Sequence, residues 1–324
     1  MLLNIVFVII GVIMVLVGAD KLTDGSVALA RIFSIPEMVI GLTIVAFGTS
    51  LPEFVVSLVA SINNIPAMSV ANIVGSNIFN TLVIVGATAI TSQIAIPRST
   101  IMKDIPFVLL ASIVLFAFAQ DSLLNPGAKI DVIDRGDGIA LLAFFAIFMY
   151  STIKLATNRV VVPEGIEQTE SSVQQMSKIK ITIYLIAGLI ALIGGGQLFV
   201  EGASGIAHGI GISDAVIGLT LVAGGTSLPE LATSVIAARK GQSGIAIGNV
   251  IGSNLFNIFW VLGACAVVTP LPVTGLTTFD FAMLVISSIL FWLFGRTNHT
   301  INRVEGVILC GCFIAYISML LSNL

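Results

Sequence analysis

Ten stretches of mainly apolar residues determine what this chain can fold into. They fall at about 2–19, 36–62, 68–93, 104–119, 138–157, 181–200, 213–238, 244–268, 278–295 and 304–322. A helix needs about 20 apolar residues to cross the hydrocarbon core of a bilayer. Only 10% of the residues are charged, whereas soluble domains carry about 25%. The sequence therefore predicts an all-α integral membrane protein with ten transmembrane helices.

Basic residues are divided unevenly between the loops on the two sides of the predicted membrane. When the loops are assigned alternately, one side receives only Lys129 and Arg135 of the 14 Lys and Arg residues, and the other receives the rest. Loops rich in Lys and Arg stay in the cytoplasm, so we expect both termini outside a prokaryotic cytoplasmic (inner) membrane. The first stretch is expected to be a span and not a signal peptide, because no basic residue precedes it. No basic run suggests a nucleic-acid partner; the expected surroundings are the lipid bilayer.

The chain contains two copies of one long motif, 177 residues apart. The first reads GLTIVAFGTSLPE at 41–53 and GSNIFN at 75–80, and the second reads GLTLVAGGTSLPE at 218–230 and GSNLFN at 252–257. Five predicted spans separate equivalent positions, and an odd number inverts the second copy. We therefore predict two inverted-topology five-helix repeats, 1–157 and 181–324, joined by a cytoplasmic linker at 158–180. Inverted repeats are common in secondary transporters, although channels and intramembrane enzymes also contain repeats.

Each copy places one acid in the middle of a predicted span, Glu53 in the first and Glu230 in the second. A carboxylate at that depth costs several kcal/mol unless something compensates it. A bound cation is the simplest compensation, and a protonated, hydrogen-bonded structural glutamate is the alternative. The acid occurs twice within the same motif, and this favours the cation.

A Gly-x-x-x-Pro pattern stands immediately before each acid, at Gly48 and Pro52 and again at Gly225 and Pro229. Proline removes a helical hydrogen bond and crowds the carbonyl four residues back. Freed carbonyls in lipid must meet protein, water or an ion. Broken helices at the membrane midplane are where transporters coordinate such ions, although a plain proline kink would have the same sequence.

Helical spacing gathers further oxygen-bearing residues around the two acids. Residues that share a face with each acid, or form a stripe on the next helix, are Ala46, Thr49 and Ser57; Ala223, Thr226 and Ser234; Asn72, Ser76 and Asn80; and Asn249, Ser253 and Asn257. Single hydroxyls often bond to their own helix, and asparagines can join helices. Carboxylates, hydroxyls and amides without nearby soft ligands suit hard cations such as Na⁺ or Ca²⁺. Two ionised glutamates balance one Ca²⁺ or two Na⁺, and a site that accepts either load is the core of an antiporter.

The paired motifs resemble the two alpha-repeats of sodium/calcium exchangers, within the cation/calcium antiporter superfamily. The resemblance implies an ion cluster at the bilayer centre, built from the second, third, seventh and eighth helices. It implies calcium binding by Glu53 and Glu230 with backbone oxygens of Thr49 and Thr226. It further implies sodium ligands at Ala46, Ser50, Ser76, Ala223, Thr226, Ser227 and Ser253, with Asn80 and Asn257 completing the ring. Na⁺ and Ca²⁺ are then transported ions, and no cofactor is expected.

Two departures from the family pattern carry information. Asn257 stands where potassium-dependent relatives have an acid, which indicates potassium-independent exchange. Gly224 stands where the first copy has Phe47, so the two helix breaks are expected to differ in flexibility. The resulting hypothesis is a secondary active antiporter that exchanges Na⁺ for Ca²⁺ by alternating access. A Ca²⁺/H⁺ antiporter of the same fold and a cation channel remain alternatives. An enzyme is not expected, because no nucleophile–base pair or metal-ligand set is visible.

Overall fold

The structure, a computed structural model, describes residues 1–63, 65–124, 127, 130–157, 176–209 and 223–322. The first half of the chain forms α1 (Leu2–Phe33), α2 (Glu37–Ile40), η1 (Gly41–Val45), α3 (Ala46–Thr49), α4 (Leu51–Ile62), α5 (Ala67–Phe79), η2 (Asn80–Ile84), α6 (Val85–Thr91), β1 (Ile94–Ala95), η3 (Thr100–Asp104), α7 (Ile105–Phe118), α8 (Asp121–Leu124), β2 (Val132–Ile133) and α9 (Arg135–Thr157). The second half forms α10 (Lys178–Gly209), α12 (Ala223–Thr226), α13 (Leu228–Arg239), α14 (Ser243–Leu255), η5 (Phe256–Leu262), α15 (Gly263–Val268), β3 (Leu271–Pro272), α16 (Thr278–Arg296), β4 (Thr300–Ile301) and α17 (Arg303–Ser322). The elements named η are π-helical turns within longer helices.

The described residues contain eight helices that are long and apolar enough to cross a membrane. A ninth span is the broken helix Glu37–Thr49 plus Leu51–Ile62, whose two parts are bent by 45°. Large apolar side chains on the outer helices are exposed, as lipid contact requires; Ile13 of α1 is 56% exposed and Ile190 of α10 is 65% exposed. The prediction of an all-α integral membrane protein is thus confirmed. The expected span at 213–238 lies partly outside the described residues, and its described part forms α12 and α13.

Two helices are much longer than the sequence analysis expected. The hydropathy windows end at residues 19 and 200, but α1 continues to Phe33 and α10 runs over Lys178–Gly209. The first window is wrong because charged residues end it although they remain helical. Asp20 and Asp24, one turn apart on α1, each place a carboxylate oxygen 2.6 Å from Nζ of Lys240 at the end of α13. The helix stops only where Ser34 turns into the left-handed region, with φ of 52°.

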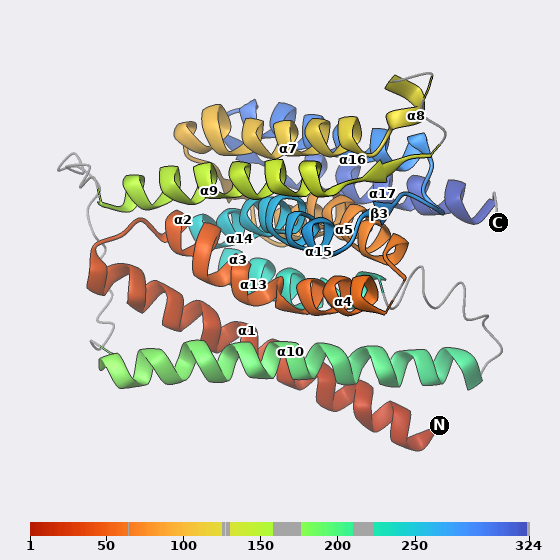
Figure 1. Ribbon diagram of the computed structural model, residues 1–324. Helices are drawn as coiled ribbons and strands as arrows, with labels where there is room; N and C mark the ends of the chain where they lie inside the picture. The colour runs from red at the N-terminus through yellow and green to blue at the C-terminus, as the bar shows by residue number, and fades with distance from the viewer. Residues whose placement is uncertain (64, 125–126, 128–129, 158–175, 210–222, 323–324) are drawn as a thin grey trace.

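The helices α1 and α10 cross each other at one side of the bundle (Figure 1). Glycines allow their backbones to approach closely. A Cβ added at Gly18 would lie 2.7 Å from the carbonyl oxygen of Gly188, and one added at Gly11 would lie 2.7 Å from that of Gly195. Small residues at such crossings are a general feature of helix packing in membranes. This pair therefore associates mainly through backbone and small side chains.

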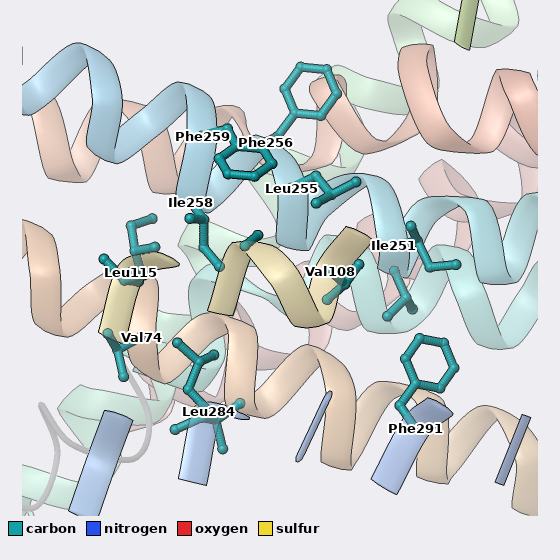
Figure 2. Close-up of a cluster of buried hydrophobic side chains, with 14 of the residues drawn as sticks. Val74, Val108, Leu115, Ile251, Leu255, Phe256, Ile258, Phe259, Leu284 and Phe291 are labelled. Atoms are coloured by element: carbon teal, nitrogen blue, oxygen red, sulfur yellow. The ribbon is translucent and has the colours of Figure 1, made fainter. Parts of the chain in front are cut away.

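Two other helices form the centre of the bundle. The segments Ala67–Thr91 and Ser243–Val268 are 72% and 83% buried, whereas the other six full-length spans are 22–39% buried. Apolar side chains of this centre, including Val74, Leu255 and Phe259, pack against Leu115 and Leu284 of the neighbouring helices (Figure 2). Polar residues on the same two helices therefore lie far from lipid and water.

Short strands join the ends of the bundle. The strand β1 pairs antiparallel with β4, where Ile94 faces Ile301, and β2 pairs antiparallel with β3, where Val132 faces Pro272. Each pair connects one strand from the first half of the chain with one from the second. In Figure 1, α1 begins and α17 ends at the same end of the bundle.

Candidate cation site

The two broken helices place the glutamates. Ser50 separates α3 from α4, and Ser227 separates α12 from α13; both have φ near −90° and ψ near 0° (−85° and 4°, −91° and 7°). Proline occupies the first turn of each following helix, where its missing N–H costs no helical hydrogen bond. Glu53 and Glu230 lie in these first turns and are both 0% exposed. The predicted interruption before each acid is confirmed.

The carboxylate of Glu53 is held by hydroxyls from both halves of the chain. Ser227 of the second break donates to Glu53 Oε1 at 3.0 Å, and Ser76 of α5 donates to the same oxygen at 3.2 Å. The two serine oxygens also lie 2.6 Å apart, within hydrogen-bonding distance. One carboxylate oxygen is therefore fixed by a small polar cluster that spans the two halves.

Glu230 has the equivalent arrangement with the halves exchanged. Ser50 of the first break donates to Glu230 Oε1 at 3.0 Å, and Ser253 of α14 donates to it at 3.4 Å. Each glutamate thus receives one hydroxyl from the opposite break and one from the helix that follows its own. These four serines were predicted to lie near the acids, but no pattern in the sequence predicted that the bonds cross between the halves.

Several oxygens at the centre have no protein partner among the described residues. Within the described part of the chain, Oε2 of Glu53, Oε2 of Glu230 and Oδ1 of Asn257 are buried and accept no hydrogen bond; neither Oδ1 nor Nδ2 of Asn80 has a partner. Asn80 and Asn257 are both 0% exposed. Buried polar atoms are normally paired, and an orphaned one costs about 1–3 kcal/mol, more when charged. Four such oxygens from the two motif copies point to a ligand that accepts oxygen lone pairs, and a cation is such a ligand.

A second pair of asparagines holds the helices together. Asn72 Nδ2 lies 3.4 Å from the carbonyl oxygen of Glu53 and 3.0 Å from Ser57 Oγ. Asn249 Nδ2 makes the same two contacts with Glu230 and Ser234, at 3.3 and 3.0 Å. The alternative that asparagines join helices is therefore correct for these two residues. They fix the backbone on which each glutamate stands.

The structure describes the threonine and alanine of the first motif copy more fully than those of the second. Thr49 is fully buried; its hydroxyl lies 3.1 Å from Oδ1 of Asn249 and 3.4 Å from the carbonyl oxygen of Ala46, which is also buried. Thr226 is partly buried on α12, and Ala223 begins that helix. The side chain of Ala223 lies outside the described residues.

Sequence reasoning missed Asn77 and Asn254, the middle asparagines of the two GSN motifs. Asn77 Nδ2 donates to the carbonyl oxygen of Asn254 at 3.1 Å, and Asn77 Oδ1 accepts from Asn257 Nδ2 at 3.0 Å. Asn254 donates in turn to Thr81 at 3.0 Å. These bonds connect the two central helices and fix the amide of Asn257. The two asparagines themselves recur at the offset of 177 residues, and this was a signal that could have revealed them.

Both central helices widen at this level. The π-helical turn η2 begins at Asn80, and η5 begins one residue before Asn257. Single π turns inside α-helices occur frequently at functional sites. In this chain they coincide with Asn80 and Asn257, two of the three asparagines whose amide oxygens have no partner in the described part of the chain; the third is Asn254.

The chemistry of the cluster is that of a hard-cation site. The described residues contain no group of three or more His, Cys, Asp or Glu side chains that could hold a metal. The two carboxylates are instead surrounded by neutral hydroxyl and amide oxygens. Such ligands suit Na⁺ and Ca²⁺ better than zinc or copper. Fold and cluster together define an integral membrane protein with a buried, oxygen-lined candidate cation site.

Comparison with known proteins identifies the family. The family described as "Sodium/calcium exchanger protein" matches residues 3–154 and 180–322. The chain is 31% identical to the sodium/calcium exchanger MaX1 of Methanosarcina acetivorans, over 98% of each chain, and 35% identical to the inner membrane protein YrbG of Escherichia coli, over 99% and 97%. A solved structure of the sodium-calcium exchanger NCX_Mj, soaked with Na⁺ and Sr²⁺, superposes with a TM-score of 0.82 at 35% identity and 98% coverage of both chains. The chain therefore belongs to the sodium/calcium exchanger family.

Proposed function

We propose that this protein is a secondary active antiporter that exchanges Na⁺ for Ca²⁺ across a prokaryotic cytoplasmic membrane by alternating access. The observation that carries the proposal is the pair of fully buried glutamates, each with one carboxylate oxygen that has no partner among the described residues. One Ca²⁺ or two Na⁺ neutralise the pair. Because either load alone balances the charge, binding of one disfavours the other, and the two ions exchange.

The proposed ligands divide between the two ions. Ca²⁺ prefers six to eight oxygens at 2.3–2.6 Å, which the glutamates and nearby backbone oxygens of Thr49 and Thr226 supply. The remaining proposed sodium ligands are Ala46, Ser50, Ser76, Ala223, Ser227 and Ser253, and Asn80 and Asn257 complete the ring. The buried position of the four serines against the two carboxylates supports this set. The unpartnered amide oxygens support the inclusion of the asparagines.

The proposed architecture is a pair of inverted five-helix repeats, residues 1–157 and 181–324, with ten spans and both termini outside. It is supported by the 177-residue offset in the sequence and by hydrogen bonds that recur at that offset. Asn72 and Asn249, for example, make the same two contacts in the two copies. Neutral Asn80 and Asn257 support exchange that does not require K⁺, because neither adds a third charge.

The test is ion flux in reconstituted vesicles. Vesicles loaded with Na⁺ and diluted into Na⁺-free buffer are expected to take up Ca²⁺, and vesicles loaded with choline or K⁺ are not. Equal uptake with choline inside would refute sodium coupling. Uptake driven only by a pH gradient would identify a Ca²⁺/H⁺ antiporter, and Ca²⁺ passage without any counter-ion would identify a channel.

A further inference from the structure

A surface cavity lies beside the candidate cation site. It has a volume of about 510 Å³ and lies between α10, α4 and the second helix break. Pro52 and Pro229, which each directly precede a buried glutamate, form part of its wall, as does Thr226. The cavity is therefore adjacent to both halves of the site.

The cavity is large enough for a hydrated cation. A Ca²⁺ ion with eight waters needs ~240 Å³, at about 30 Å³ for each water. The available volume is about twice that. Most of the wall is apolar, from Leu51, Val55, Val56, Ile193 and Val200. Such a wall offers few groups that would retain an ion on its way to the centre.

Among the described residues, one acidic side chain lines this cavity. Glu201 and Gln197 stand one turn apart on α10, and both are exposed. Residues four apart on a helix have Cβ atoms about 5–6 Å from each other. The carboxylate and the amide therefore lie on the same face of α10, toward the wall that contains Thr226.

Comparison with the other motif copy shows that the negative charge of Glu201 has no basic partner among the described residues. Position 24 is the equivalent of Glu201 at the offset of 177, and its acid, Asp24, pairs with Lys240 at 2.6 Å. The equivalent of Lys240 in the first copy is Asn63, which carries no charge. In the part of the chain that the structure describes, the ion pairs involve Asp20 and Asp24, and none involves Glu201. The negative charge of Glu201 is thus free to act on mobile cations.

We propose that Glu201 is the residue that recruits cations into this cavity and so feeds the buried site from the end of the bundle where α10 ends. This inference rests on the proposed transport function and adds to it an access residue outside the ion-binding cluster. The carboxylate raises the local concentration of cations, and of divalent ones most. It does not coordinate the ion at the transport site, so it affects capture and leaves turnover unchanged.

The expected size of the effect follows from Coulomb's law. A divalent cation ~6 Å from one carboxylate in water, screened at 0.15 M salt, is concentrated about threefold, and at 0.01 M salt about sevenfold. For Na⁺ the corresponding factors are below about threefold at both salt concentrations. Loss of the charge should therefore raise the apparent KM for Ca²⁺ by these factors, more at low salt, with Vmax unchanged.

The closing experiment has one readout that depends on transport and one that does not. Ca²⁺ uptake is measured for wild type and for E201Q at 0.01 M and 0.15 M salt. The matched control is D134N, which removes an exposed acid at the start of α9, at the same end of the bundle but not in the cavity wall. E201Q should raise the apparent KM about sevenfold and threefold, and D134N should leave it unchanged. An equal KM for E201Q and wild type at low salt overturns the inference. Absence of sodium-driven uptake in the wild type refutes the proposed function instead.

The second readout measures the field of Glu201 directly. A single cysteine is introduced as Q197C after Cys265, Cys310 and Cys312 are replaced by serine. Its rates of reaction with a cationic and an anionic water-soluble thiol reagent are then compared. The cationic reagent should be favoured, and adding E201Q should reduce the ratio of the two rates about threefold at 0.15 M salt. An unchanged ratio, or a cysteine that neither reagent reaches because lipid fills the cavity, overturns the inference.

Discussion

Replacement of Glu53 by glutamine should change calcium binding and protein stability in opposite directions. Glutamine keeps an oxygen that can accept the hydrogen bonds from Ser227 and Ser76, which lie 3.0 and 3.2 Å from Glu53 Oε1. It removes the negative charge and replaces Oε2, an atom without a partner in the described part of the chain, with an amide group. The change therefore isolates the charge from the shape of the site.

The loss of calcium affinity is expected to be large. Removing one partner from a buried charge pair costs about 3–5 kcal/mol. At 1.4 kcal/mol for each factor of ten, the dissociation constant for Ca²⁺ should rise by roughly 10²- to 10⁴-fold. Exchange should then fall below detection at concentrations that saturate the wild type.

The stability of the ion-free protein should rise in the same variant. Glu53 is 0% exposed and has no basic partner among the ion pairs of the described residues. A neutral amide is cheaper to bury than an unpaired carboxylate. We expect a higher Tm for E53Q than for wild type in the presence of a chelator, by an amount that corresponds to about 1–3 kcal/mol.

Thermal unfolding in detergent, with chelator and with increasing Ca²⁺, measures both effects. Calcium should raise the Tm of the wild type, because a ligand at 100 times its Kd stabilises by about 2.7 kcal/mol, and should leave that of E53Q unchanged. The matched control is E305Q. Glu305 is 8% exposed and caps α17 by accepting from the backbone N–H of Asn302 at 2.8 Å. This variant should lose stability, because the charged carboxylate makes a stronger hydrogen bond and interacts favourably with the N-terminus of α17. It should keep its calcium response. A calcium-induced shift of wild-type size in E53Q would show that the charge of Glu53 does not hold the ion. A lower Tm in chelator would show that the buried carboxylate does not destabilise the ion-free protein.

Three further predictions concern the neighbours of the glutamates and the helix pair at the edge. Ser227→Ala should weaken Ca²⁺ and Na⁺ exchange more than Ser50→Ala, because Ser227 contacts both Glu53 and Ser76; equal flux in the two variants would contradict this. Asn257→Asp should make Ca²⁺ uptake dependent on K⁺ or pH, because a third carboxylate needs another cation; uptake measured against K⁺ at two pH values checks it, and the wild type should not respond. Gly18→Leu should lower stability by about 1–3 kcal/mol through overpacking against α10, seen as a lower Tm.

The sequence predicted which residues form the candidate cation site better than it predicted the hydrogen bonds between them. The acids are conspicuous in apolar surroundings, and helical spacing of three to four residues singled out Ser76 and Ser253 on the next helices. Ser50 and Ser227 came only from the resemblance to the repeats of sodium/calcium exchangers. That Ser50 bonds to Glu230 and Ser227 to Glu53 depends on how the two breaks face each other. Contacts between residues about 175 positions apart are set by tertiary packing, and no local pattern encodes them.

Mean hydropathy predicted the ends of helices poorly. The window on α1 ended before Asp20 because charged residues lower its mean hydropathy, yet the helix continues for more than three turns beyond Asp20. Lys240, more than 200 residues away, forms ion pairs with Asp20 and Asp24 at 2.6 Å. Helix propensity also gave no indication that the span Ala67–Thr91 would widen at Asn80, since a π-helical turn depends on the side chains packed around that turn.

The crossed serine bonds bear on how such a site could arise. Each glutamate takes one hydroxyl from the other motif copy: Ser227 serves Glu53, and Ser50 serves Glu230. A chain with a single copy would therefore have half a site, and it could complete it only by pairing with a second molecule of itself. Duplication and fusion would convert that obligatory partner into part of the same chain. After fusion each copy can diverge alone, and the substitution of glycine at position 224 for the phenylalanine at position 47 is one difference that a pair of identical subunits could never acquire.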